Sequence, residues 1–192
     1  GTIEFKNVSF KYPDADEYVL KDISFQAKAG ETVAFIGSTG SGKSTLINLI
    51  PRLYDATEGK ILIDDIDVRE YDLETLNKKI GYIPQRGVLF SGTVRSNVDF
   101  GDNDADDETI KKSISVAQAA NFVSRMPDGV DSNIAQGGTN VSGGQKQRLS
   151  IARTLIRNPK IFIMDDSSSA LDMATEAKLQ KSIKETMKDS TV

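Results

Sequence analysis

The run Gly37-Ser-Thr-Gly-Ser-Gly-Lys-Ser44 constrains the fold of this 192-residue chain more than any other stretch. It matches the phosphate-loop pattern G-x-x-x-x-G-K-[ST] at every fixed position. Residues 32–36 before it favour a strand, and after it apolar side chains recur at helical spacing in a helix that Pro51 ends or bends. A glycine-rich loop between a strand and a helix predicts an α/β fold that binds nucleotide phosphates; an ordinary turn into a helix is the alternative.

The residue types of the loop predict its chemistry. Glycines let the backbone curl so that N–H groups face phosphate oxygens, the Lys43 ammonium reaches the β- and γ-phosphates, and the Ser44 hydroxyl ligates Mg²⁺. The predicted nucleotide contacts are Gly37, Ser38, Thr39, Gly40, Ser41, Gly42, Lys43, Ser44 and Thr45.

Composition narrows the class of protein. A hydrophobic fraction of 38% with 27% charged residues is ordinary for one globular domain, and a net charge of −4 argues against a broad nucleic-acid surface. No apolar run approaches the ~20 residues of a membrane helix, so we expect the chain to be soluble by itself. Cysteine and histidine are absent, which excludes disulfides and thiolate chemistry and agrees with a cytosolic location.

The acidic run Asp102–Glu108 lacks the glycine of a calcium loop and is expected to lead into a helix instead.

Apolar patterns predict the other elements. Strands at residues 3–10 and 20–25 form an antiparallel hairpin, and a strand at 59–64 ends in the tight turn Asp64-Asp65. The loop Leu89–Thr93 is expected to expose apolar side chains, as a lobe core or a docking surface. Further strands are expected at 80–85, 161–165 and from 190 on, with helices at 73–79, near 110–117, between 142 and 156, and between 172 and 187.

Four further places carry candidate chemistry. Tyr12 ends a strand, where it stacks on adenine or is simply a surface tyrosine. Gln85 also ends a strand, where it contributes to Mg²⁺ or to the attacking water, or is a plain loop residue. Asp165 follows a buried strand and orients Mg²⁺ through its water shell, and Asp166 stands where a general base faces the γ-phosphate. Ser142 and Gln145 form a capping box, which either only starts a helix or leaves its end open to a phosphate, such as one bound by another subunit.

The order of these motifs resembles the nucleotide-binding domain of an ABC exporter over nearly the whole chain. Residues 37–44 match the Walker A loop, Tyr12 the A-loop aromatic, Gln85 the Q-loop, 142–145 the signature, 161–165 Walker B and 169–172 the D-loop. The resemblance implies an α/β fold with a P-loop core and an antiparallel β lobe, at about 1–85 and 146–192, and an inserted helical lobe at about 86–145.

The resemblance also implies how the domain works. Such domains pair head to tail, as homodimers or heterodimers, so that Ser142, Gly143, Gly144, Gln145 and Asp172 would serve the ATP of the partner subunit. Ser44, Gln85 and Asp165 would hold Mg²⁺ in this chain's own site, and Gln85 and Asp166 would be its catalytic residues. Transmembrane domains would dock near Gln85–Thr93, at the cytoplasmic face of a membrane, with no nucleic acid as partner.

The sequence departs from the family pattern at several places. Asp166 replaces the usual glutamate, and a carboxylate misplaced by roughly 1 Å can cost on the order of 10²-fold in rate, so we hypothesise a degenerate site that binds ATP and hydrolyses it slowly. Alternatively, Asp166 works through a rearranged water.

The family's switch histidine is absent, and we expect the chain to be truncated at its C-terminus. Val141 and Asp65 replace the usual leucine and glycine, and neither change should abolish binding.

The sequence is also compatible with two other functions. One is a soluble ABC ATPase acting on nucleic acid or ribosomes, against which the short spacing from Gln85 to Ser142 and the acidic composition argue. The other is a non-hydrolysing nucleotide sensor, which Asp166 permits. The transported substrate is not encoded in this chain.

Overall fold

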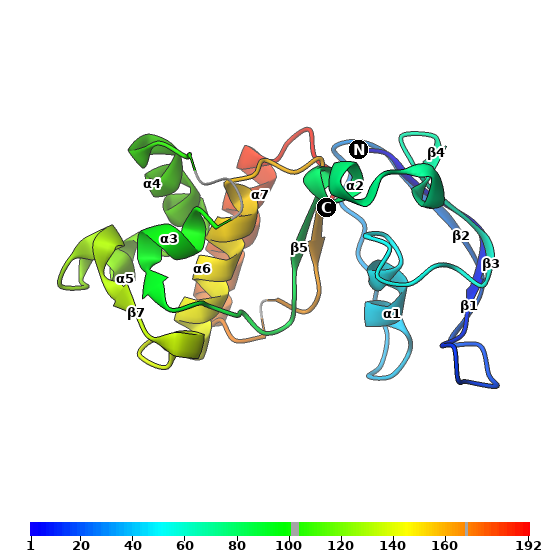
Figure 1. The fold of residues 1–192 in the computed structure, drawn as a ribbon, viewed down its shortest axis with the longest axis horizontal. Coiled ribbons are helices and arrows are strands. Elements are labelled where there is room, and N and C mark those ends of the chain that lie inside the picture. Colours follow the sequence, from blue (N-terminus) through cyan, green and yellow to red (C-terminus); the bar gives the residue numbers. More distant parts are fainter. Residues whose placement is uncertain (101–103, 168) are drawn as a thin grey trace. The chain divides into compact units, whose positions relative to one another are not determined.

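The computed structural model describes residues 1–100, 104–167 and 169–192. Its contacts divide the chain into two compact units, whose elements are labelled in Figure 1. The β unit comprises residues 1–80, 160–163 and 189–192, and the α unit comprises residues 81–159 and 164–188. The lobe boundaries expected near 85 and 145 stay a prediction.

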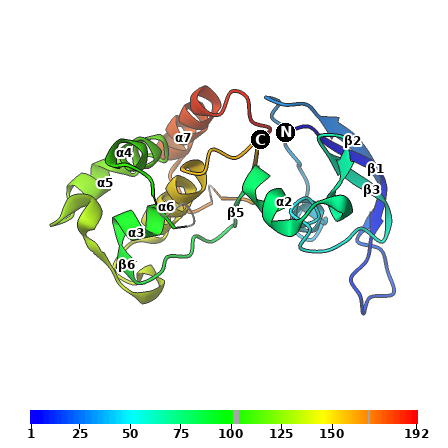
Figure 2. The same ribbon diagram turned by 45° about the horizontal axis from the view of Figure 1, so that its top comes forward.

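A four-stranded antiparallel sheet organises the β unit. Its strands are β1 (Ile3–Phe10), β2 (Leu20–Ala27), β3 (Glu58–Ile63) and β4 (Ile66–Asp67), in the order β2-β1-β3-β4 (Figures 1 and 2). Phe5 is buried and stacks on Phe25 of β2, with ring centroids 4.6 Å apart. Asp64 and Asp65 have φ of 50° and 65°, so the tight turn predicted from these residues is confirmed.

Short helices accompany the sheet. They are α1 (Lys43–Asn48), the 3₁₀ turn η1 (Val68–Glu70) and α2 (Leu73–Lys79), whose bounds agree with the predicted helix. Asp72 caps α2 by accepting a hydrogen bond of 3.0 Å from the Thr75 amide. The helix after the phosphate loop ends at Asn48, earlier than Pro51, because 3₁₀-type bonds such as Ile50 N to Ile47 O (3.2 Å) replace its next turn.

The predicted strand at residues 32–36 is wrong. Val33 donates to the Val192 carbonyl at 2.8 Å and Val192 donates to Glu31 at 2.9 Å, but this short pairing does not extend further among the described residues. Ile36 is 97% exposed. A strand exists only where a neighbouring strand takes its backbone hydrogen bonds, and the β propensity of this segment cannot replace that neighbour.

The α unit is built around one long helix. α6 (Gly143–Leu155) packs against α3 (Val94–Val98) and α4 (Asp107–Val116), and α4 also contacts α7 (Met173–Thr186) (Figure 2). Leu149, Ile151 and Ala152 of α6 are fully buried. The smaller elements are α5 (Ala120–Ser124), η2 (Gly129–Asp131), η3 (Gln136–Gly138) and the paired strands β6 (Gly92–Thr93) and β7 (Asn133–Ile134).

Side-chain caps fix where the helices of the α unit begin. Asp106 accepts from the Thr109 amide at 2.8 Å, and Asp107 and Glu108 follow in the first turn of α4, as predicted. The start of the acidic run, at residues 102 and 103, lies outside the described residues. The unit boundary falls within β5 (Ile80–Ile83) and β8 (Ile161–Met164), the strands that lead to Gln85 and Asp165.

Candidate functional site

The phosphate loop lies in the β unit and closes around its own lysine. The Lys43 ammonium donates hydrogen bonds of 2.8 Å to the carbonyls of Gly37 and Ser38. Gly40 and Gly42 have φ of 82° and 92°, a left-handed conformation that side chains with a Cβ rarely adopt. Two of the predicted loop glycines, Gly40 and Gly42, therefore take the backbone conformation for which glycine is needed.

The loop fits a nucleotide triphosphate. Residues 37–41 and Ser44 are exposed, and a Cβ built on Gly40 would meet nothing within 4 Å, so the backbone there is open to a ligand. A fixed ammonium, several hydroxyls and backbone amides form a donor set suited to phosphate oxygens, and a serine hydroxyl is an oxygen ligand of the kind that Mg²⁺ takes.

Tyr12 lies against the first turn of α1. Its hydroxyl is 2.9 Å from Oγ1 of Thr45, and its ring packs edge to face on Tyr54, with centroids 5.3 Å apart, and on Phe10 at 5.0 Å. The structure thus brings two predicted nucleotide residues, Tyr12 and Thr45, together next to the loop. The neighbouring rings of Phe10 and Tyr54 meet Tyr12 edge to face and hold it in place, and the aromatic ring of Tyr12 itself is of the kind that stacks on a flat base.

The two carboxylates after β8 lie in the α unit with Gln85. The Asp165 amide donates to the Ile83 carbonyl at 3.0 Å, which holds it beside the end of β5. The Gln85 side-chain amide donates to Oδ2 of Asp166 at 3.0 Å. Asp166 is exposed and has φ of 45°, which aspartate tolerates better than most residues.

Tyr82 is a site residue that the sequence analysis missed. Its hydroxyl donates to Oδ2 of Asp165 at 3.4 Å. Burial, and after it the neighbouring Asp165 charge, together raise the pKa of Tyr82 to about 12. A tyrosine within a strand carries no signal of such a contact, because the partner lies 83 positions away.

The signature residues begin α6 as predicted. Gln145 N donates to Ser142 Oγ at 3.2 Å and Ser142 N donates to Gln145 Oε1 at 2.9 Å, so the capping box is confirmed. A Cβ on Gly143 would meet nothing within 4 Å, whereas one on Gly144 would lie 2.9 Å from the Ala170 carbonyl. Glycine is therefore needed at 144 for the close approach of the loop that leads to Asp172.

Asp172 is the N-cap of α7. It accepts hydrogen bonds from the Thr175 hydroxyl at 2.7 Å and from the Thr175 amide at 2.9 Å, and these bonds lower the pKa of Asp172. The α unit thus holds Gln85, Asp165, Asp166, the signature residues and Asp172. Ser44 belongs to the β unit, and the Mg²⁺ ligand set of Ser44, Gln85 and Asp165 stays a prediction.

The segment that follows Gln85 exposes some of its apolar side chains and buries others. Val88, Phe90 and Phe100 are 56%, 45% and 54% exposed, and the two phenylalanine rings lie 4.7 Å apart. Leu89 is 1% exposed, so its predicted exposure is wrong: it points into the core beneath the loop. The Arg153 guanidinium, 5.0 Å from the centre of the Phe90 ring, fixes the loop by donating to the Val88 carbonyl at 2.9 Å.

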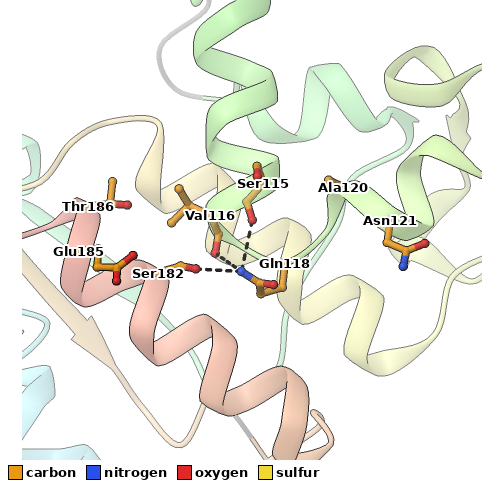
Figure 3. A pocket seen from close by; sticks show the side chains of 8 residues that line it. All are labelled: Ser115, Val116, Gln118, Ala120, Asn121, Ser182, Glu185 and Thr186. Atoms are coloured by element: carbon orange, nitrogen blue, oxygen red, sulfur yellow. Dashed lines mark hydrogen bonds between the residues drawn. The ribbon is translucent and has the colours of Figure 1, made fainter.

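A separate polar pocket of about 410 Å³ lies between α4, α5 and α7 (Figure 3). The Gln118 side-chain amide crosses it and donates to Ser182 Oγ at 2.9 Å. None of the predicted site residues lines this pocket. Its lining residues are Ser115, Val116, Gln118, Ala120, Asn121, Ser182, Glu185 and Thr186.

Comparison with known families identifies the class of domain. The family model described as "ABC transporter" matches residues 20–169. The chain belongs to the ABC transporter family. At the family level it is an ATP-binding ATPase domain. No helix among the described residues has the length and apolarity to span a bilayer.

Several relatives share this domain. The uncharacterized ABC transporter ATP-binding protein YfiB of Bacillus subtilis is 50% identical over 183 residues, covering 95% of this chain and 32% of YfiB. The putative multidrug export ATP-binding/permease protein YgaD of the same species is 43% identical over 191 residues, covering 100% of this chain and 33% of YgaD. A solved bacterial Atm1-family ABC exporter with ATP bound superposes with a TM-score of 0.92 at 37% identity, covering 99% of this chain and 33% of that one. The chain spans about a third of the length of these relatives.

Proposed function

We propose that this chain binds MgATP and couples its binding and hydrolysis to export through attached transmembrane domains. The observation that carries the proposal is the phosphate loop, in which the Lys43 ammonium is held by the carbonyls of Gly37 and Ser38 while the glycine backbone stays open. The likeness to an exporter solved with ATP bound supports the choice of nucleotide.

Each residue of the chain's own site has a distinct task in this proposal. Lys43 binds the β- and γ-phosphates, Tyr12 stacks on adenine, and Ser44, Gln85 and Asp165 hold Mg²⁺, with Asp165 acting through a water. An Mg²⁺ ion held by these residues would neutralise phosphate charge as it develops. Tyr82 keeps the Asp165 carboxylate oriented by its hydrogen bond.

Asp166 accepts the proton of the attacking water. Its side chain is one methylene shorter than glutamate, and the Gln85 amide holds one of its oxygens at 3.0 Å. Because a general base must lie within hydrogen-bond reach of the proton it removes, we propose that this site turns over slowly.

The remaining residues serve partner domains. Ser142, Gly143, Gly144, Gln145 and Asp172 face the ATP of a second nucleotide-binding domain in a head-to-tail dimer. The exposed side chains of Val88, Phe90 and Phe100 receive the transmembrane domains. In this proposal the domain works at the cytoplasmic face of a membrane.

The test is ATP turnover by the assembled transporter in which the catalytic acid of the partner subunit is disabled. Asp166→Glu should raise turnover by about 10-fold or more, since the longer carboxylate reaches the water. Lys43→Met should abolish nucleotide binding, while the exposed control Lys21→Met on β2 should not. No gain from Asp166→Glu would overturn the slow-site proposal. Absence of ATP binding by the wild type would overturn the function itself, and binding without any turnover would favour a nucleotide sensor.

A further inference from the structure

We propose that Gln147 is a positioning residue that fixes the Q-loop, and with it Gln85, on the helix that carries the signature motif. The inference deepens the proposed function and rests on it. Gln147 lies two positions after the signature motif, within the second turn of α6.

The first evidence is a buried polar side chain with one defined partner. Gln147 is 1% exposed, and its Nε2 donates a hydrogen bond of 3.0 Å to the Pro84 carbonyl, directly before Gln85. Burying an amide is unfavourable unless it is hydrogen-bonded, so this group binds the Q-loop backbone at a place where an apolar residue would otherwise suit the core.

The other end of the same loop also lies close to α6. A Cβ built on Gly87 would lie 2.8 Å from the Lys146 carbonyl and 2.8 Å from Ser150 Oγ, so only glycine lets the loop lie flush on α6. The segment from Pro84 to Gly87 is therefore hydrogen-bonded to α6 at Pro84 and packs closely against the same helix at Gly87.

These contacts join two parts of the proposed mechanism. The first turn of α6 is capped by Ser142 and Gln145, which face the ATP of the partner subunit in the proposed dimer. One turn later, Gln147 holds Pro84, and Gln85 in turn donates to Asp166 at 3.0 Å. A displacement of the α6 start on binding of the partner's ATP is passed on to the side chain that holds the catalytic carboxylate.

Hydrogen exchange tests, without any nucleotide, whether Gln147 fixes the Q-loop on α6. In the full-length protein, Gln147→Met and, separately, Gly87→Ala should each speed amide exchange of residues 85–88 by about 3- to 10-fold, the range that the loss of one net hydrogen bond implies. The matched control is Thr154→Val, which removes a buried hydroxyl bonded at 3.0 Å to Ser150 O on the same helix and leaves the Pro84 contact intact. Unchanged exchange at 85–88 in Gln147→Met would overturn the inference.

A double-mutant cycle tests whether the effect acts through Gln85. Single-turnover hydrolysis of radiolabelled ATP, with the partner's acid disabled, should slow by about 3- to 10-fold in Gln147→Met while the Kd for ATP changes less than about 2-fold. In a Gln85→Ala background, the same substitution should have no further effect. An equal slowing in both backgrounds would overturn the positioning role. A wild-type protein without turnover would count against the proposed function, and the exchange experiment would still decide the inference.

Discussion

The side-chain amide of Gln85 donates a hydrogen bond of 3.0 Å to the carboxylate of Asp166, 81 positions later in the chain. Gln85 follows β5 and Asp166 follows β8, so the ends of these two strands bring together the amide and the carboxylate that the sequence assigned to catalysis. The bond holds one carboxylate oxygen and leaves the other to accept a proton.

Gln85→Ala should slow hydrolysis more than it weakens ATP binding. The substitution removes the donor that orients Asp166, and loss of a positioned general base is expected to cost on the order of 10²-fold in rate. Single-turnover hydrolysis and equilibrium ATP binding separate the two effects. The control is Gln180→Ala, at an exposed position of α7. A loss of affinity as large as the loss of rate would assign Gln85 to binding alone.

Tyr12 should act through its ring and not through its hydroxyl. Tyr12→Phe removes the contact of 2.9 Å with Thr45 but keeps the aromatic face, so ATP affinity should change little. Tyr12→Ala removes the stacking surface and should weaken ATP binding by about 3- to 10-fold, as expected for an aromatic pair worth about 1 kcal/mol. Calorimetric titration with ATP measures both variants. An equal loss of ATP affinity in Tyr12→Phe and Tyr12→Ala would instead assign the interaction to the hydroxyl.

Substitutions of the capping residues of α6 and α4 should distinguish a loss of stability from a loss of function. Ser142→Ala and Asp106→Ala each remove a capping side chain, and each should lower the free energy of unfolding by about 1 kcal/mol, or Tm by roughly 2–4 °C. Only Ser142→Ala should raise the ATP concentration needed for dimerisation, because only Ser142 faces the partner's nucleotide in the proposed dimer. Light scattering against ATP concentration measures this difference. Equal dimerisation in the two variants would reduce Ser142 to a structural cap.

Tyr82 should make the fold sensitive to alkali. Its pKa is raised to about 12, first by burial and then by the Asp165 charge, so folding favours the neutral phenol. The stabilisation is fully present below the unfolded pKa of about 10 and is lost as pH rises from there through about 12. Tyr82→Phe should therefore reduce the fall in Tm over that range, and Asp165→Asn should reduce it partly, because burial remains. Melting curves at increasing pH check both variants, and an unchanged alkaline slope in Tyr82→Phe would contradict the assignment.

Much of the fold follows from short sequence patterns. The N-cap of α2 by Asp72, the capping box of Ser142 and Gln145, and the left-handed turn at Asp64 and Asp65 each depend on residues within four positions of one another. Such features form wherever the local sequence allows them, so their residue types predict them directly. The same holds for the phosphate loop, where Gly40 and Gly42 adopt the positive φ that the pattern requires.

The sequence by itself determined the family, the phosphate loop and the helix caps. Only the tertiary structure decided that residues 34–36 pair with no strand among the described residues, that Tyr82 reaches Asp165, and that the buried Gln147 holds the loop before Gln85. The Tyr82 and Gln147 contacts join residues more than sixty positions apart in the chain. A side chain carries no local mark of which distant backbone group it will meet, because packing of whole elements chooses that partner.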